Sequence, residues 1–166
     1  MPVADRLQAD VLQRFVGRDT GPIRSRDAVN AAMIRHWCVA LGDANPVYAD
    51  AAVARQTIHG DVIAPPAMLQ AWTMPDPFAA PGTDAVGELY ALLDAHGYSG
   101  IAATDSEQDY LAPVRIGDVL TATKTITAIS DAKQTALGLG HFITSTVEWV
   151  NEAGVTVGTQ LHRVLK

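Results

Sequence analysis

The feature that most constrains the fold of this 166-residue chain is a change of hydrophobic spacing near residue 100. The stretch from Asn30 to Leu41 places its apolar residues at intervals of three and four, which is typical of one helix face. After Ile101 the chain consists of segments rich in Thr, Val and Ile, separated by turn-forming residues. Helices followed by an antiparallel meander predict an α+β domain in which a curved sheet wraps around one buried helix.

The same patterns predict the individual elements. Helices are expected over Ala4–Val16, Asn30–Leu41, Asp50–Gln56, Pro66–Met74 and Glu88–Ala95. Strands are expected before the turn at Arg115–Asp118, and then over Val119–Ile129, Leu137–Val150 and Val155–Leu165. The helix that begins at Pro66 is apolar on nearly every side, so we expect it to be buried. No linker or repeat divides the chain, which predicts a single domain over residues 1–166 with an N-terminal helix and loop over residues 1–21.

Composition narrows the classes of function. Hydrophobic residues make up 48% of the chain and charged residues 18%, which suggests that a partner chain covers some apolar surface. The net charge is −6 and no basic block occurs, so nucleic-acid binding is not expected. No apolar run approaches the roughly 20 residues of a membrane span, and the N-terminus is unlike a signal peptide. We therefore expect a cytoplasmic protein without membrane partners.

Neither a disulfide nor a metal site is expected. Cys38 is the single cysteine, and its apolar helical setting is typical of a buried, unreactive thiol. The five histidines lack metal-site spacing. His141 and His162 fall on expected strands and should face solvent or an interface. No redox cofactor is implied.

The segment from Leu41 to Ala54, "LGDANPVYADAAVA", carries the most specific signal. It resembles the Gly-Asp-x-Asn-Pro-aliphatic-His motif of the MaoC-like, R-specific enoyl-CoA hydratases, which have a hot-dog fold. Tyr48 stands where that motif has its histidine. The matching positions are Gly42, Asp43, Asn45, Pro46 and Val47. "APPAMLQAW" resembles the start of the family's central helix, and "YLAPVRIGDVL" and "VEWVNEAGVTV" resemble its sheet, so the resemblance extends from Pro22 to Lys166.

The chain is most similar to the N-terminal-type half of this family, and particularly to the larger subunit of the two-subunit hydratase of actinobacterial cholesterol side-chain breakdown. The resemblance implies a double hot dog, formed with a partner that carries Asp and His in a heterodimer or heterotetramer. It implies a bulky, steroid-like 2-enoyl-coenzyme A thioester as substrate and no further cofactor. It also implies a possible association with an aldolase through an OB-fold domain that lies outside this sequence.

The tyrosine decides the expected mechanism. In the family, Asp and His share the proton transfers of hydration, and histidine suits this role because its pKa lies near neutral pH. A tyrosine has a pKa of about 10 and is therefore a poor base at pH 7. Asp43 and Tyr48 thus form a degenerate dyad, and we expect no catalytic residue in this chain.

Substrate contacts are expected around the central helix and the motif. Backbone N–H groups at the start of the Pro66 helix resemble the family's oxyanion hole, so Pro65, Pro66 and Ala67 are expected to contact the substrate there, although a plain buried helix with prolines at its start fits as well. The other candidates are Asn45 in the motif, His59 near the tunnel, Gly60 at a turn or close ligand approach, Asp109 and Tyr110 in the acyl channel, and Arg115 at the coenzyme A phosphates. Lys124, Lys133 and Arg163 could also meet phosphates, and for every one of these cations a solvated surface charge is the simpler interpretation.

Three functions remain open at this point. The first is a dyad-deficient subunit of a heteromeric enoyl-CoA hydratase. The second is a self-sufficient homodimeric hydratase or dehydratase that uses Asp43 with His59. The third is a scaffold in an acyl-coenzyme A pathway that only binds a partner enzyme. A hot-dog thioesterase is disfavoured because the central helix offers only Gln70, which is neither base nor nucleophile.

Overall fold

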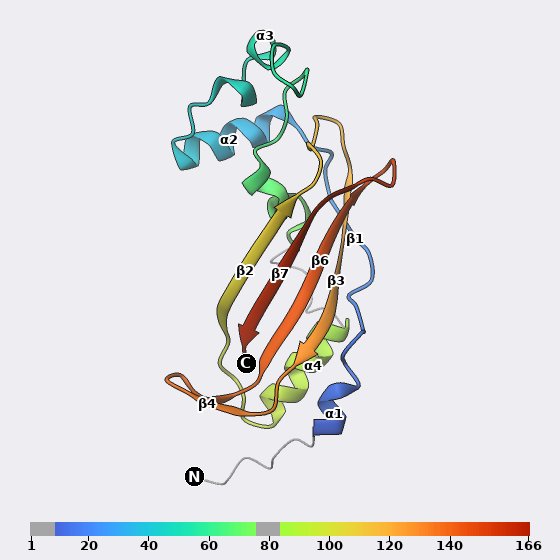
Figure 1. The fold of residues 1–166 in the computed structure, drawn as a ribbon, viewed down its shortest axis with the longest axis vertical. Coiled ribbons are helices and arrows are strands. Elements are labelled where there is room, and N and C mark those ends of the chain that lie inside the picture. The colour runs from blue at the N-terminus through green and yellow to red at the C-terminus, as the bar shows by residue number, and fades with distance from the viewer. Residues whose placement is uncertain (1–8, 76–83) are drawn as a thin grey trace.

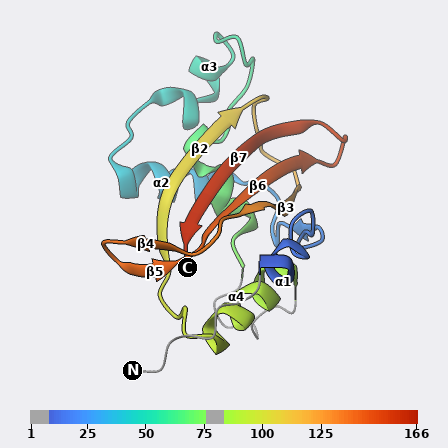
Figure 2. The ribbon, with the colours of Figure 1, turned by 60° about the horizontal axis from the view of Figure 1, so that its bottom comes forward.

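A curved antiparallel sheet forms the centre of the molecule. The computed structural model describes residues 9–75 and 84–166, and its main sheet has the strand order β1-β3-β6-β7-β2 (Figure 1). The long strands bend together as a crescent in Figure 2. The sheet strands are β1 (Ile23–Arg24), β2 (Ala102–Tyr110), β3 (Leu120–Ile129), β6 (Phe142–Asn151) and β7 (Thr156–Leu165), and a separate hairpin pairs β4 (Lys133–Thr135) with β5 (Gly138–Gly140).

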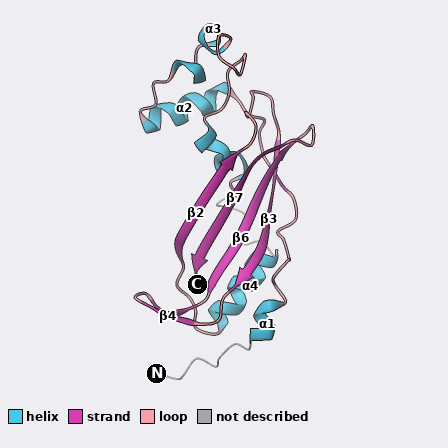
Figure 3. Ribbon diagram, in the orientation of Figure 1, coloured by secondary structure: helices cyan, strands magenta, loops and turns pink. Residues whose placement is uncertain are grey.

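Helical segments gather at the two ends of the sheet (Figure 3). The α-helices are α1 (Ala9–Gln13), α2 (Ala31–Leu41), α3 (Ala51–Ala54) and α4 (Ala85–Ala95), and the 3-10 helices are η1 (Pro46–Tyr48) and η2 (Pro66–Thr73). Asn30 begins α2 by accepting a hydrogen bond from the Met33 N–H, and Gly42 ends it in the left-handed conformation. These are the ends that the sequence predicts.

One face of the sheet carries the core in two clusters. The first cluster packs η2, through Met68, Leu69 and Trp72, against the end of the sheet near α2. The second packs Leu12 of α1 and Leu89 and Leu93 of α4 against the opposite end. In the described ranges, the interior is therefore covered by two separate groups of helices, one at each end of the sheet.

The helix predicted from Pro66 to Met74 differs from expectation in type and burial. It is a 3-10 helix that ends at Thr73, and its residues Pro66, Ala67 and Gln70 are exposed. Only the side that bears Met68, Leu69 and Trp72 meets the sheet. The predicted burial on every side was wrong because apolar composition alone does not show how much of a helix its neighbours cover.

Three further predicted elements have different boundaries in the structure. The strand predicted over Leu137–Val150 is broken, because Gly138 takes a φ of +113° and belongs to the β4–β5 hairpin, so β6 begins only at Phe142. Helix α4 begins three residues before the predicted Glu88, where Asp84 accepts hydrogen bonds from two backbone N–H groups. Of the predicted Ala4–Val16 helix, residues 1–8 lie outside the description, and the described helix α1 ends at Gln13, three residues before the predicted end at Val16.

Strand β2 lies at one edge of the sheet and pairs only with β7 among the described strands. Its second edge therefore presents backbone hydrogen-bonding groups that this chain does not pair within the described ranges. Across residues 9–75 and 84–166 we find no helix with the length and apolar character needed to span a membrane.

Candidate functional site

A pocket of about 270 Å³ lies beside η2 at the end of β2, and we call it the β2-end pocket. Two chain segments meet there because the Ala64 N–H donates to the Val114 carbonyl at 2.8 Å and Ile63 pairs with Arg115 across a short bridge. Its walls are mostly apolar. They include His59, Pro65 and Pro66, Leu69 and Trp72 of η2, and Tyr110 and Leu111.

Several residues predicted to contact substrate converge on this pocket. His59, Pro65 and Pro66 line it, whereas Gly60 and Ala67 are exposed neighbours in sequence. Because Pro66 has no N–H, the first backbone donor of η2 is the Ala67 N–H. The structure therefore places the start of η2 at the pocket, as the resemblance implies, while any contact with substrate stays a prediction.

Of the other residues predicted to contact the substrate near this pocket, one lines it and two do not. Tyr110 lines the pocket, but Asp109 is not part of its lining. Arg115 is exposed, and its backbone N–H donates to the Asp118 carboxylate at 2.7 Å. Arg115 is not part of the pocket lining, although Val114, which precedes it in sequence, is.

The motif residues line a second pocket of about 370 Å³, which we call the Asp43 pocket. Asp43, Asn45 and Tyr48 meet there with Cys38 of α2. The Asp43 carboxylate accepts from the Asn45 N–H at 3.0 Å, and the Asn45 side chain accepts from the Val47 N–H at 3.2 Å. These bonds fix the loop at the start of η1, so the Asn45 side chain serves the backbone.

Electrostatics in the Asp43 pocket oppose proton abstraction by Tyr48. Partial burial raises the pKa of Tyr48 above its usual 10.0, and the neighbouring Asp43 charge raises it further. Burial, followed by Asp43, also raises the pKa of the Cys38 thiol. Both groups therefore hold their protons at neutral pH. The absence of a catalytic residue stays a prediction, and these directions support it.

His59 and Asp43 line different pockets, and the two linings share no residue. A catalytic pair of Asp43 with His59 would need both side chains to reach one reacting centre. The arrangement does not favour such a pair within one chain.

Trp72 is a pocket residue that the sequence reasoning missed. Its indole nitrogen is buried and has no hydrogen-bond partner in the described structure, whereas the indole of Trp149 donates to Thr73 at 2.8 Å. A tryptophan within the apolar run of η2 was the available signal, but the helical spacing does not reveal which of its atoms lack a partner.

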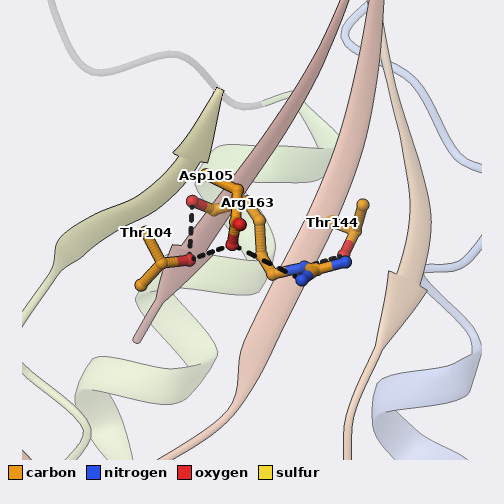
Figure 4. A network of polar contacts seen from close by, with 4 residues as sticks. All are labelled: Thr104, Asp105, Thr144 and Arg163. Carbon is orange, nitrogen blue, oxygen red and sulfur yellow. Dashed lines mark hydrogen bonds and ion pairs between the residues drawn. The ribbon is translucent and has the colours of Figure 1, made fainter. Parts of the chain in front are cut away.

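Of the remaining cations and histidines, Arg163 lies at the surface, whereas Lys124 is half-buried and His141 is buried. Arg163 lies on the outer face of the sheet, where it contacts Asp105 at 3.4 Å and Thr144 at 3.2 Å (Figure 4). Lys124 is half-buried, so the solvated-charge interpretation was wrong for it. His141 is buried, contrary to expectation, and its Nδ1 lies 2.8 Å from the Ser130 carbonyl oxygen. Within the described ranges, no three His, Cys, Asp or Glu side chains gather as a metal site would require.

The curved antiparallel sheet, its helical core and the pocket at the start of η2 define a hot-dog protein of the MaoC-like dehydratase class. Residues 14–160 match the family described as "FAS1-like, dehydratase domain region", and the chain belongs to that family. The crystal structure of the ChsH1-ChsH2 complex from Mycobacterium tuberculosis includes a chain of the same fold. It superposes with a TM-score of 0.84 at 38% identity, over 89% of this chain and 88% of that one.

Two curated relatives are similar in sequence. A probable enoyl-CoA hydratase alpha subunit of Thermomonospora curvata is 43% identical over 160 residues, which cover 93% of this chain and 50% of that protein. The 3-oxo-4,17-pregnadiene-20-carboxyl-CoA hydratase alpha subunit of Mycobacterium tuberculosis is 38% identical over 144 residues, covering 86% and 46%. The chain thus spans about half the length of these two relatives.

Proposed function

We propose that this chain is the dyad-deficient subunit of a heteromeric enoyl-CoA hydratase. The observation that carries the proposal is Tyr48, a phenol with a raised pKa beside Asp43, at the position where the family motif has its histidine. Hydration joins the oxygen of water to the β-carbon of the enoyl thioester and a proton to its α-carbon. A protonated phenol cannot accept the proton that water releases, so a partner subunit supplies the Asp and His.

In this proposal the chain binds the acyl thioester and helps to shape the tunnel. The apolar β2-end pocket receives part of the acyl group, and the Ala67 N–H at the start of η2 is a donor for the thioester oxygen. Arg115, exposed beside this pocket, is the candidate partner for the phosphates of coenzyme A. The substrate is a coenzyme A thioester, and no other cofactor takes part.

The proposed acyl group is bulky and steroid-like. Support comes from the Mycobacterium tuberculosis relative, whose name describes a hydratase of a pregnadiene carboxyl-CoA. Within the described ranges, two separate groups of helices, rather than one long helix, cover the concave face of the sheet. This arrangement is compatible with a large acyl group between them.

The partner is a dyad-bearing hot-dog chain in a heterodimer or heterotetramer. The open edge of β2 is the candidate contact, since a second sheet could extend the ladder there. Both alpha-subunit names and the heteromeric ChsH1-ChsH2 structure support a partner. An association with an aldolase stays a prediction from the family resemblance alone.

The two alternatives make different predictions. A self-sufficient homodimer would need Asp43 and His59 to cooperate, and their separate pockets argue against this within one chain. A pure scaffold would need no acyl pocket, and the apolar β2-end pocket favours thioester binding over that role.

The test is hydration of a steroid 2-enoyl-CoA by the purified chain, alone and after co-purification with a dyad-bearing chain. We expect turnover only in the complex. Normal activity of the isolated chain that His59→Ala abolishes would support the homodimer instead. Calorimetry that detects no thioester binding, even in the complex, would support the scaffold.

A further inference from the structure

The concave face of the sheet carries polar residues where its two apolar clusters meet. Pairing across the strands places Ser106 opposite His162, and His162 opposite Ser145. The neighbouring row contains Gln160 opposite Val147, and Val147 opposite Lys124. Directly opposed residues share a face, as do residues two apart on one strand. We call Ser106, Lys124, Ser145, Gln160 and His162 the polar band.

The band lies on the face that elsewhere forms the core. On one side of it, Trp149 opposes Ala122 in the first cluster, and on the other, Ile143 opposes Val164 in the second. Core strands gain stability from apolar residues at such positions, and polar side chains there cost free energy unless they are hydrogen-bonded. Packing of the fold alone therefore does not account for the band.

Three members of the band have no hydrogen-bond partner for their side chains in the described parts of the chain. Gln160 donates to the Ser106 hydroxyl at 2.9 Å, but the ammonium of Lys124, the imidazole of His162 and the hydroxyl of Ser145 make no such bond. Ser145 is only 3% exposed. These groups supply hydrogen-bond donors that face the interior of the hot dog.

The band continues from the β2-end pocket along the same strands. Tyr110, which lines the pocket, donates its hydroxyl hydrogen to Gln108 at 2.6 Å, and Gln108 lies opposite Gln160. Because Tyr110 and Gln108 are two residues apart, they share the concave face. An acyl group that enters at the pocket and extends along this face would bring its far end to the band.

The burial of the band makes a neutral hydrogen-bond acceptor a suitable ligand group. Burial lowers the pKa of His162, and the neighbouring Lys124 lowers it further, so the imidazole is neutral at pH 7. Burial also lowers the pKa of Lys124, an effect that Asp84 partly opposes. A surrounding that disfavours charge suits a ketone oxygen, which accepts hydrogen bonds without bringing a charge into the interior.

We propose that the polar band binds an oxo group at the end of the acyl moiety distant from the thioester, and so selects oxo-steroid acyl groups over their deoxy counterparts. This inference rests on the proposed function. The apolar clusters on either side would contact the hydrocarbon rings, and the donors of Lys124, Ser145 and His162 would meet the single polar atom. The name of the Mycobacterium tuberculosis relative contains a 3-oxo group of this kind.

The test compares two substrates in the complex of this chain with its dyad-bearing partner. The substrates are a 3-oxo steroid 2-enoyl-CoA and the same thioester without the oxo group. We expect kcat/KM to favour the 3-oxo substrate by about tenfold or more, the value of one or two hydrogen bonds to a buried acceptor. Ser145→Ala and Lys124→Met should each remove most of this preference and leave the deoxy substrate nearly unaffected.

Thr146→Ala is the matched control, since Thr146 follows Ser145 on β6 but points to the outer face, where it is exposed. It should keep the preference. A wild-type complex that hydrates both substrates equally well, or variants that keep the full preference, would overturn the inference while leaving the hydratase function intact. A complex that hydrates neither substrate would refute the proposed function and this inference together.

Discussion

At the scale of single residues, the Asp43 pocket shows how one residue changes the chemistry available to a loop that otherwise matches the family motif. The loop geometry is maintained by backbone hydrogen bonds to Asp43 and Asn45, which do not depend on the residue at position 48. Tyr48 packs partly against the first core cluster. A tyrosine there can support the loop and the core while it contributes no base.

Replacing Tyr48 by Phe tests this role directly. The variant removes the phenol hydroxyl but keeps the ring that packs on the first cluster, so kcat/KM of the complex should stay nearly unchanged. Loss of a general base would instead reduce the rate by about 10²- to 10⁴-fold. Steady-state hydration kinetics of the complex distinguish the two, and a loss in that range would show that Tyr48 takes part in catalysis.

His162 should make the fold less stable in mild acid. Its pKa in the folded chain lies below the usual 6.5, mainly because of burial and additionally because of Lys124. As the pH falls below 6.5, the unfolded state therefore binds a proton more readily than the native state, and the free energy of unfolding decreases. Above that pH both states are neutral at this residue, and its contribution is constant.

The measurement is urea denaturation between about pH 7.5 and pH 5.5. His162→Gln removes the titration and should flatten part of the decrease. The control is His36→Gln, at an exposed position of α2, which should keep the wild-type pH dependence. An identical slope in wild type and His162→Gln would contradict the assignment.

At the scale of elements, the contact between η2 and the sheet depends on a residue without a side chain. A Cβ atom on Gly158 would lie 2.6 Å from Cδ2 of Leu69 and 2.8 Å from the Asp109 carbonyl oxygen. The second of these atoms belongs to the backbone of the neighbouring strand, so it cannot move without disturbing the β2–β7 pairing. Gly158 thus permits the close approach of both η2 and β2.

Gly158→Ala should consequently destabilise the chain by about 1–3 kcal/mol, as overpacking in a core does. Gly100→Ala is the matched control, because no heavy atom lies within 4 Å of its Cβ position. It should change stability little. Thermal or urea unfolding of both variants provides the comparison, and equal stability of the two would contradict the packing argument.

The elements that could be predicted from the sequence were those with local signals. The ends of α2 follow from the side chain of Asn30 and the conformational freedom of Gly42, which act within a few residues. The burial of one side of η2 depends on its contact with the sheet. The sequence between Pro66 and Thr73 contains no local signal of that contact, so neither the type of the helix nor its exposed side could be predicted. The burial of His141 was missed for the same reason, since its contacts with Ser130 and Tyr98 are distant in sequence.

At the scale of the whole molecule, the sequence predicted the fold class but not that the motif residues and His59 line separate pockets. The hot-dog resemblance rested on Asp43, Asn45 and the segment after Pro65, and the structure places these segments at one end of the sheet. That His59 and Asp43 line different pockets depends on the paths of the intervening loop and of η2. Spacing along the chain carries no information about such a separation.

The open edge of β2 determines what assembly should do to the whole molecule. Among the described strands, β2 has one neighbour, whereas β6 lies between β3 and β7. If the partner extends the sheet along β2, amide hydrogen exchange over Ala102–Tyr110 should slow markedly in the complex, because the outward N–H groups gain acceptors. Exchange over Phe142–Asn151 should change little, since those amides already have partners on both sides.

A complex that forms and hydrates substrate while β2 exchanges as fast as in the free chain would show that the partner binds elsewhere. The apolar Tyr110 and Leu111, exposed at the end of the strand, would then need another explanation than coverage by a second sheet.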